Sequence, residues 1–222
     1  AAGVDGGAGA DTLSVSGPVK VAAQSDATRT AVTVAVSAAK GVAVGGTVVE
    51  ASLASVAEAT GLLGDDLDPS AADAASEADS LFLFGPADVR ATAHADAVSV
   101  GVAGAVGIGF SAALLEAALE ADADARLMAG GLGADTLVLG APATLFAEAG
   151  AAAPSVSFNL AGASFGDIDS MARAAAVGLD GGAGNDTLLA LGAIGGEARA
   201  NATGALVEVT ALGAALGKLG TE

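Results

Sequence analysis

The sequence predicts an all-β fold, a parallel β-helix-like β-solenoid of about four degenerate repeats with a narrow Ala/Val core and Gly-rich corners. Three observations lead to this prediction. A glycine-rich segment recurs along the chain, the residues between its copies alternate with a period of two, and small side chains dominate. The 222 residues include 60 Ala and 33 Gly, whereas Trp, Tyr and Cys are absent.

The glycine-rich segment has the pattern GGxGxDTL and occurs at residues 6–13, 130–137 and 181–188. A fourth, eroded copy, Asp79-Ser80-Leu81, lacks the preceding glycines. The aspartates of successive copies are 68, 56 and 51 residues apart. This self-similarity indicates stacked repeats, each of which buries its apolar face on its neighbour. We expect one continuous solenoid, a fragment of a longer chain, with repeats at approximately 5–72, 73–128, 129–179 and 180–222.

The segments between the corners predict strands, because apolar and polar residues alternate along them. Residues 31–36 align with residues 97–102, and residues 48–51 align with residues 114–117. The same pattern returns at residues 155–163 and, more weakly, at 207–209. We expect the polar members of these segments to face solvent: Thr33, Ser99, Ser157 and Glu208.

Residues 111–127 allow a helical alternative, because they are rich in Ala, Leu and Glu. The strand prediction is preferred for two reasons. Residues 121–126 alternate alanine with charged side chains, and the aligned residues 47–53 contain β-branched side chains. Inward alanines would let two sheets approach closer than the usual ~10 Å. Residues 64–73 interrupt the first repeat and indicate an acidic surface loop.

Charge and composition exclude several classes of function. Eight Lys and Arg stand against 26 Asp and Glu, which gives a net charge of −18 and argues against nucleic acid or an anionic membrane as partner. Without cysteine there is neither a disulfide nor a thiolate metal site. Residues 97–115 are uncharged but consist mainly of Gly, Ala, Val and Ser, so we expect no membrane span.

No catalytic residue is expected, and we interpret the protein as not an enzyme. His94 is the only histidine, and it stands in an alternating run that predicts a solvent-facing position on a strand. Carboxylate pairs are expected by chance in so acidic a chain. A polysaccharide-cleaving β-helix would need a groove with cations and aromatic side chains, and the sequence contains few of either.

The three complete GGxGxDTL segments resemble the nonapeptide GGxGxDxUx of the repeats-in-toxin (RTX) family, where U is a large apolar residue. The resemblance implies calcium as a cofactor, bound by turn carbonyls and by the aspartate carboxylate, with Asp5 and Asp180 adding oxygens. RTX repeats run in tandem, whereas these copies are about fifty residues or more apart, so a site requires the corners to stack. The alternative is a glycine-rich corner whose aspartate caps the turn backbone. The implied ligands are Asp5, Gly6, Gly7, Gly9, Asp11, Gly130, Gly131, Gly133, Asp135, Asp180, Gly181, Gly182, Gly184 and Asp186.

Residues 19–61 and 89–131 resemble repeats of large bacterial adhesins of the filamentous-haemagglutinin and leukotoxin-like kinds. This resemblance implies a non-enzymatic structural segment of an exported protein, located extracellularly or at the bacterial cell surface, in a filament, matrix or adhesin. Its partners would be further copies end to end or the continuation of the same chain, with a cell-surface or polysaccharide ligand of unknown identity.

Two other functions remain as alternatives. The first is an RTX-type secretion or folding module attached to a separate catalytic domain. The second is an ice-binding or ligand-binding solenoid, which would need a flat, regular outer face. The varied residues expected on the outer face disfavour the second.

Overall fold

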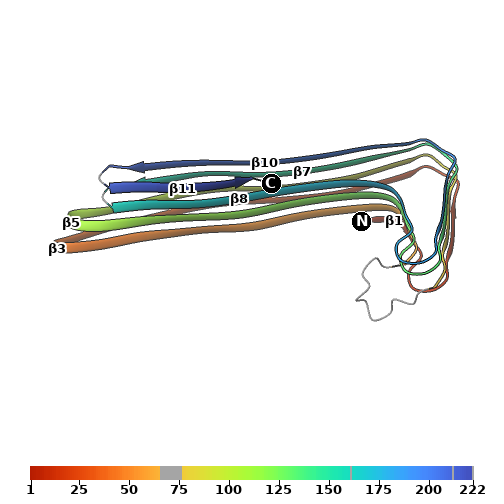
Figure 1. The fold of residues 1–222 in the computed structure, drawn as a ribbon, viewed down its shortest axis with the longest axis horizontal. Helices are drawn as coiled ribbons and strands as arrows, with labels where there is room; N and C mark the ends of the chain where they lie inside the picture. The colour runs from red at the N-terminus through yellow and green to blue at the C-terminus, as the bar shows by residue number, and fades with distance from the viewer. Residues whose placement is uncertain (66–76, 161, 212, 222) are drawn as a thin grey trace.

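The computed structural model describes residues 1–65, 77–160, 162–211 and 213–221. Those residues form an elongated β-solenoid in which all strand pairs are parallel (Figure 1). The predicted fold class is therefore confirmed. The strands are β1 (Ala2–Asp5), β2 (Thr12–Val15), β3 (Val19–Leu63), β4 (Ser80–Leu83), β5 (Ala87–Ala129), β6 (Thr136–Leu139), β7 (Ala143–Asn159), β8 (Gly162–Asp180), β9 (Thr187–Ala190), β10 (Ile194–Thr210) and β11 (Gly213–Thr221).

Each repeat makes one coil, which settles a number that the sequence left open. A coil begins with a short strand at one end of the molecule, runs outward along the long axis and then returns (Figure 1). In the first two coils the outward and return runs belong to one continuous strand, β3 or β5. In the third and fourth coils they are separate strands, β7 with β8 and β10 with β11.

The coils stack into three parallel sheets. The short strands β2, β4, β6 and β9 form a sheet that we call the corner sheet. The outward runs form the first layer, made of the first part of β3, the first part of β5, and then β7 and β10. The return runs form the second layer, made of the later parts of β3 and β5 together with β8 and β11.

The register corrects one sequence alignment. Val32 pairs with Val100, two residues beyond the partner that the sequence alignment assigned. Val48 pairs with Leu114, as the alignment predicted. The reason is a register shift between Ala38 and Val42, where the strand reverses and the first coil has two more residues than the second.

The two layers lie close together. The Oγ of Ser55 in the second layer donates a 2.7 Å hydrogen bond to the main-chain carbonyl oxygen of Ser25 in the first layer. One serine side chain therefore spans the gap at this point, whereas packed sheets usually lie ~10 Å apart. A larger side chain fits where glycine faces it: Leu115 Cδ1 lies 3.1 Å from the place that a Cβ on Gly101 would take. The close approach predicted from the small residues is observed.

The buried residues change along the long axis. Near the corner sheet they are mostly leucines and farther out they are alanines. Toward the far end the first layer buries mainly polar side chains, whereas the second layer also buries Val49, Leu115 and Ile168. The strand prediction for residues 111–127 is confirmed, because they lie in β5 with alanines 121, 123 and 125 at 0% exposure. Representative buried residues in that order are Leu81, Leu83, Leu137 and Leu139, then Ala91, Ala93, Ala95 and Ala147, then Ser99, Ser111, Ser155, Ser157 and Asn159.

The predicted orientation of the polar residues at the far end is wrong. Ser99 and Ser157 are fully buried, and Thr33 and Glu208 are half-buried, whereas Val32 is 64% exposed. In a strand, neighbouring side chains point to opposite faces. The residues that point inward are therefore those in phase with the buried alanines of the same strand. Larger side chains of the second layer, such as Leu115, fill the space between the layers here, so the first layer contributes small inner residues such as Ser99 and Gly101 and carries valine or phenylalanine outside.

No helix long and apolar enough to cross a membrane occurs in the part of the chain that the structure describes. The uncharged residues 97–115 belong to strand β5.

Candidate functional site

The glycine-rich corners stack in register. Thr12 pairs with Ser80, Ser80 with Thr136, and Thr136 with Thr187 in the corner sheet. The aspartate that precedes each of these residues therefore lies in one column, which we call the aspartate column: Asp11, Asp79, Asp135 and Asp186. The distant copies of the motif therefore stack on one another, as a site shared between them requires.

One carboxylate oxygen of the aspartate column binds the neighbouring coil. The amide of Asp11 donates to Asp79 Oδ1 at 2.8 Å, and the amide of Asp79 donates to Asp135 Oδ1 at 2.8 Å. The amide of Asp135 donates to Asp186 Oδ1 at 3.0 Å. Each carboxylate thus accepts a hydrogen bond from the backbone of the preceding coil. For Oδ1 this agrees with the alternative in which the aspartate caps the backbone, although the bond runs between coils and not within one turn.

The other carboxylate oxygen is buried and has no hydrogen-bond partner. This holds for the Oδ2 atoms of Asp11, Asp79 and Asp135. Asp79 and Asp135 are both 1% exposed. An unpaired buried carboxylate oxygen is costly, so the column is either protonated in part or serves a cation.

The first glycine of each corner makes room for this oxygen. A Cβ added at Gly6 would lie 2.9 Å from Asp11 Oδ2, and one at Gly181 would lie 2.5 Å from Asp186 Oδ2. A Cβ at Gly130 would collide with Asp135 Oδ2. The glycine is required here for space.

The later glycines of the motif are required for conformation. Gly7, Gly131 and Gly182 have φ values of 84°, 105° and 80°, in the region that favours glycine. The third motif glycines, Gly9, Gly133 and Gly184, also have positive φ.

Asp5 and Asp180 stand apart from the aspartate column, at the start of their turns. Asp5 Oδ1 accepts a hydrogen bond from the amide of Gly7 at 3.0 Å, and Asp180 Oδ1 accepts one from Gly182 at 3.1 Å. Both contacts are local turns of the Asx type. Asp180 also lies 3.6 Å from the guanidinium of Arg126.

Sequence reasoning missed two acidic residues at the corners, Asp65 and Glu77, and did not assign Asp79 to the site. Asp65 is 4% exposed, and its amide donates to the carbonyl oxygen of Gly130, so Asp65 occupies the second-glycine position of the second coil. Glu77 Oε2 accepts from the amide of Ala10 at 2.8 Å. Asp79 was identified only as part of the eroded copy. Gly64, directly before Asp65, could have identified this corner, but the sequence analysis assigned both residues to the acidic loop. Residues 66–76 lie outside the described residues.

Burial and mutual repulsion alter the protonation of the corner carboxyls. Desolvation by burial, followed by the charges of Asp65, Asp135 and Asp11, raises the pKa of Asp79 to about 6, although the hydrogen bond from Asp11 opposes the shift. Burial and the charge of Asp186 raise the pKa of Asp135. Burial and the charge of Asp11 raise the pKa of Asp65.

The donor set at the corners fits part of a calcium shell. Unpaired carboxylate oxygens are hard ligands, and a cation among them would relieve both their repulsion and their desolvation. Within the described residues no group of three or more acidic or histidine side chains already surrounds a single point. A bound calcium would therefore draw its remaining ligands from turn carbonyls and water.

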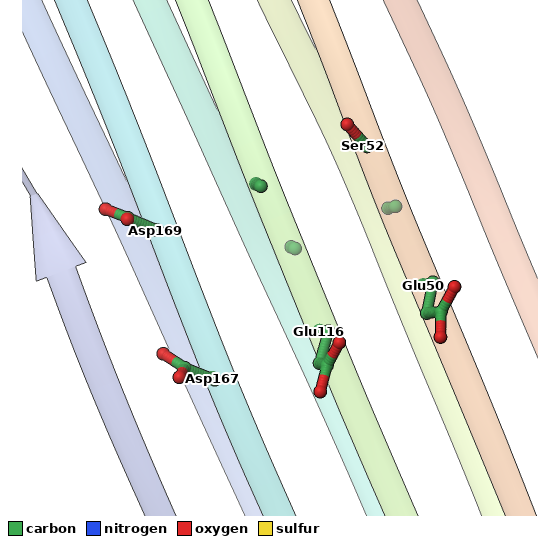
Figure 2. A pocket seen from close by; sticks show the side chains of 8 residues that line it. Glu50, Ser52, Glu116, Asp167 and Asp169 are labelled. Atoms are coloured by element: carbon green, nitrogen blue, oxygen red, sulfur yellow. The ribbon is translucent and has the colours of Figure 1, made fainter.

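A second acidic feature lies on the outer face of the second layer. Glu50, Glu116 and Asp167 stand in register on neighbouring strands, and Asp169 lies two residues further along β8 (Figure 2). They line a shallow groove of about 400 Å³. Their in-register carboxylates repel one another, so the groove favours cations in general.

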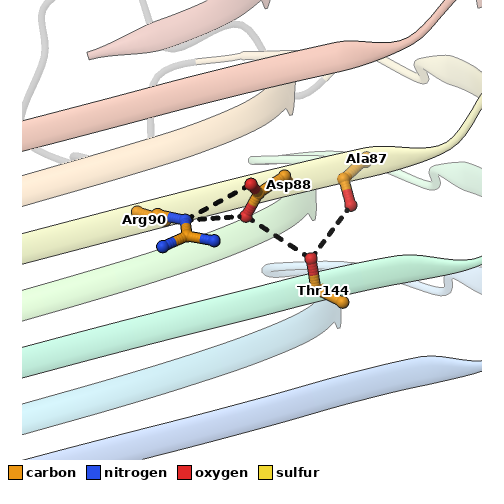
Figure 3. Close-up of polar contacts among 4 residues, drawn as sticks. All are labelled: Ala87, Asp88, Arg90 and Thr144. Carbon is orange, nitrogen blue, oxygen red and sulfur yellow. Dashed lines mark hydrogen bonds and ion pairs between the residues drawn. The ribbon is translucent and has the colours of Figure 1, made fainter.

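The outer face of the first layer carries local ion pairs in its half nearer the corner sheet. Arg90 Nε lies 3.0 Å from Asp88 Oδ1, and the Thr144 hydroxyl on the next coil is 3.4 Å from the same oxygen (Figure 3). His94 Nδ1 lies 3.3 Å from Asp26 Oδ1 on the outer face. The expected outward, strand position of His94 is confirmed.

The pentapeptide of residues 162–166 fits the GxSxG spacing of a nucleophile elbow, so the interpretation that the sequence contains no such motif is wrong. Its serine, Ser164, is 0% exposed and faces inward from strand β8, with its hydroxyl 3.2 Å from that of Thr210. An elbow requires a sharp turn that exposes the serine. The match has no catalytic geometry.

No protein-family model, curated protein or solved structure matches this chain.

Proposed function

We propose that this chain is a non-enzymatic structural repeat segment of a large exported bacterial protein, a surface filament, matrix or adhesin, and that calcium stabilises it. The observation that carries the proposal is the aspartate column with its unpaired, buried Oδ2 atoms. A long stack of parallel strands also suits a role that spans distance. Its repeated units bury their surfaces on one another, so further units extend it end to end, as copies or as continuation of the chain.

Calcium would act through folding. The ion would gather buried oxygens whose charge otherwise opposes the stacking of coils, and binding to the folded state alone adds its free energy to stability. Outside the cell, where calcium is plentiful, the stack would be most stable. The residues that would hold it are Asp11, Asp79 and Asp135, whose Oδ2 atoms are unpaired, with the turn carbonyls beside them.

The test is thermal unfolding of the full chain, followed by circular dichroism, with calcium and with chelator. We expect calcium to raise the melting temperature and magnesium to raise it less, because magnesium requires a smaller, more regular shell. The Asp135→Asn variant should lose most of the calcium response.

The matched control is Glu116→Gln, which removes one charge from the outer groove and leaves the corners unchanged. It should retain the response. Equal melting temperatures with calcium and with chelator, or an equal loss of response in both variants, would contradict the proposal.

The same corners favour one second candidate, the RTX-type secretion or folding module. It predicts the same response to calcium. The two candidates differ in the parent reading frame, where a neighbouring catalytic domain favours the module and many further repeats of this kind favour the filament.

A further inference from the structure

The first layer carries an apolar patch at its far end. Its outward side chains come from the four coils in register, and Val32, Val100, Val156 and Val207 form one complete column of valines. The next column is Val34, Val102, Phe158 and Val209. We call these columns, with their flanking residues Val36, Val98, Pro154, Leu160 and Ala205, the valine patch.

The valine patch is exposed and free of charge. Val34 is 63% exposed, Phe158 45% and Val209 45%. Apart from Thr30, which pairs with Val98 at the edge of the patch, its outward residues are apolar. The half of the same face nearer the corner sheet carries charged side chains such as Asp26, Asp96 and Glu148. The boundary runs across all four strands.

The side chains behind the patch are polar. Ser99 and Ser155 are buried, and each has an Oγ without a hydrogen-bond partner. In its far half the first layer thus places apolar side chains outside and hydroxyls inside, the reverse of the usual arrangement in a water-soluble domain, while the second layer opposite still buries Val49 and Leu115. This reversal makes an uncovered outer face unfavourable.

We infer that the valine patch pairs face to face with the valine patch of a second copy of this chain. Both surfaces are flat sheets with the same strand spacing, so columns of one can pack between columns of the other, as in β-sandwiches. The inference does not depend on calcium or on export.

The distribution of charge selects this occupant and its orientation. A two-fold axis between the two faces, perpendicular to the strands, superposes only the far halves and carries the charged halves to opposite ends. Repulsion between two chains of net charge −18 is then smallest. The same charge disfavours an anionic lipid surface. The outer face of the second layer is a poorer candidate, because its exposed Val48 is followed two residues later by Glu50, which pairs with Glu116 on the next coil.

The area of the valine patch determines how strongly two copies are expected to associate. Four strands at ~4.8 Å spacing and about seven residues at ~3.3 Å give roughly 450 Å² per copy. A pair would bury about 900 Å², below the ~1,200 Å² at which stable, specific interfaces begin, so we expect a weak, micromolar, concentration-dependent dimer.

Sedimentation velocity of the full chain, over roughly 1 to 200 µM in chelator, tests the inference. The wild type should shift from monomer to dimer. Phe158→Lys should remain monomeric across that range, because it buries a charge in the contact. Since lysine lowers the net negative charge, a loss of pairing cannot be ascribed to added repulsion between chains.

Phe165→Lys is the matched control, because Phe165 is 42% exposed on the outer face of the second layer in the same coil. It should dimerise like the wild type. Circular dichroism establishes that each variant is folded, and Val34→Lys replaces Phe158→Lys if that variant does not fold.

A second measurement locates the contact. The chain has no cysteine, so pyrene attached to Val156→Cys reports on one site, and face-to-face pairing predicts excimer emission that grows with concentration. The inference is overturned if the wild type stays monomeric, if Phe158→Lys and Phe165→Lys behave alike, if excimer emission is absent, or if the monomeric chain instead binds neutral phosphatidylcholine vesicles.

Discussion

At the scale of single residues, Asp79 shows how the corners combine structural and ionic demands. Its Oδ1 accepts the amide of Asp11, while its Oδ2 is buried without a partner. The raised pKa, about 6, means that the folded state holds this proton more tightly than the unfolded chain does. Stability from this group is therefore full below the unfolded pKa and is lost as pH rises through about 6.

The predicted consequence is that Asp79→Asn stabilises the chain at neutral pH in chelator. The amide oxygen can still accept the hydrogen bond from Asp11, and the buried charge is removed. A shift of about two pKa units corresponds to roughly 3 kcal/mol as an upper bound. Urea unfolding at pH 4 and pH 7.5 measures it: wild-type stability should fall between these values and the variant's should fall less. A wild type whose stability rises over this interval would refute the assignment.

Glycine at the first corner position gives a second residue-scale prediction. Gly130→Ala should destabilise by about 1–3 kcal/mol, because its Cβ would overlap Asp135 Oδ2. Gly17→Ala is the control, since nothing lies within 4 Å of the Cβ it would add. Chemical denaturation measures the free energy of unfolding of both variants. Equal values would show that the corner has room for a Cβ at residue 130.

At the scale of the element, the space between the two layers determines which residues the long strands can carry on their inner face. Ala121 is 0% exposed and faces the first layer, whereas Ala118 in the same strand faces solvent. Ala121→Leu should therefore prevent stable stacking or cost about 1–3 kcal/mol or more, and Ala118→Leu should change stability little. Thermal unfolding distinguishes them, and similar effects in both variants would contradict the narrow gap.

Period and repetition made the strands, the corners and the number of repeats predictable. Orientation was not predictable, because Val32 and Thr33 alternate identically whichever faces inward. Packing against the opposite layer, where Leu115 and Val49 are buried, decides between them. The pairing of Val32 with Val100 escaped prediction because the extra residues sit at the reversal of the strand. Asp65 was missed because it replaces a glycine next to an insertion, so the motif no longer matches there.

At the scale of the whole molecule, the solenoid divides along its length. Near the corner sheet, leucine and alanine are buried and charges are outside, the arrangement that is usual in water-soluble proteins. Toward the far end, the first layer buries hydroxyls and carries valines outside, while the second layer contributes the buried Val49, Leu115 and Ile168. The acidic corners and the valine patch thus lie at opposite ends, so cation binding and pairing between copies use different parts of the same coil.

The most direct test of this account is the accessibility of single cysteines along the far half of β7, in a chain that has none of its own. Cysteines would replace Val156, Ser157, Phe158 and Asn159 one at a time, and a small thiol reagent would be applied at concentrations where the chain is monomeric. The account predicts rapid labelling at 156 and 158 and protection at 157 and 159. Rapid labelling at 157 and 159 with protection at 156 and 158 would contradict it.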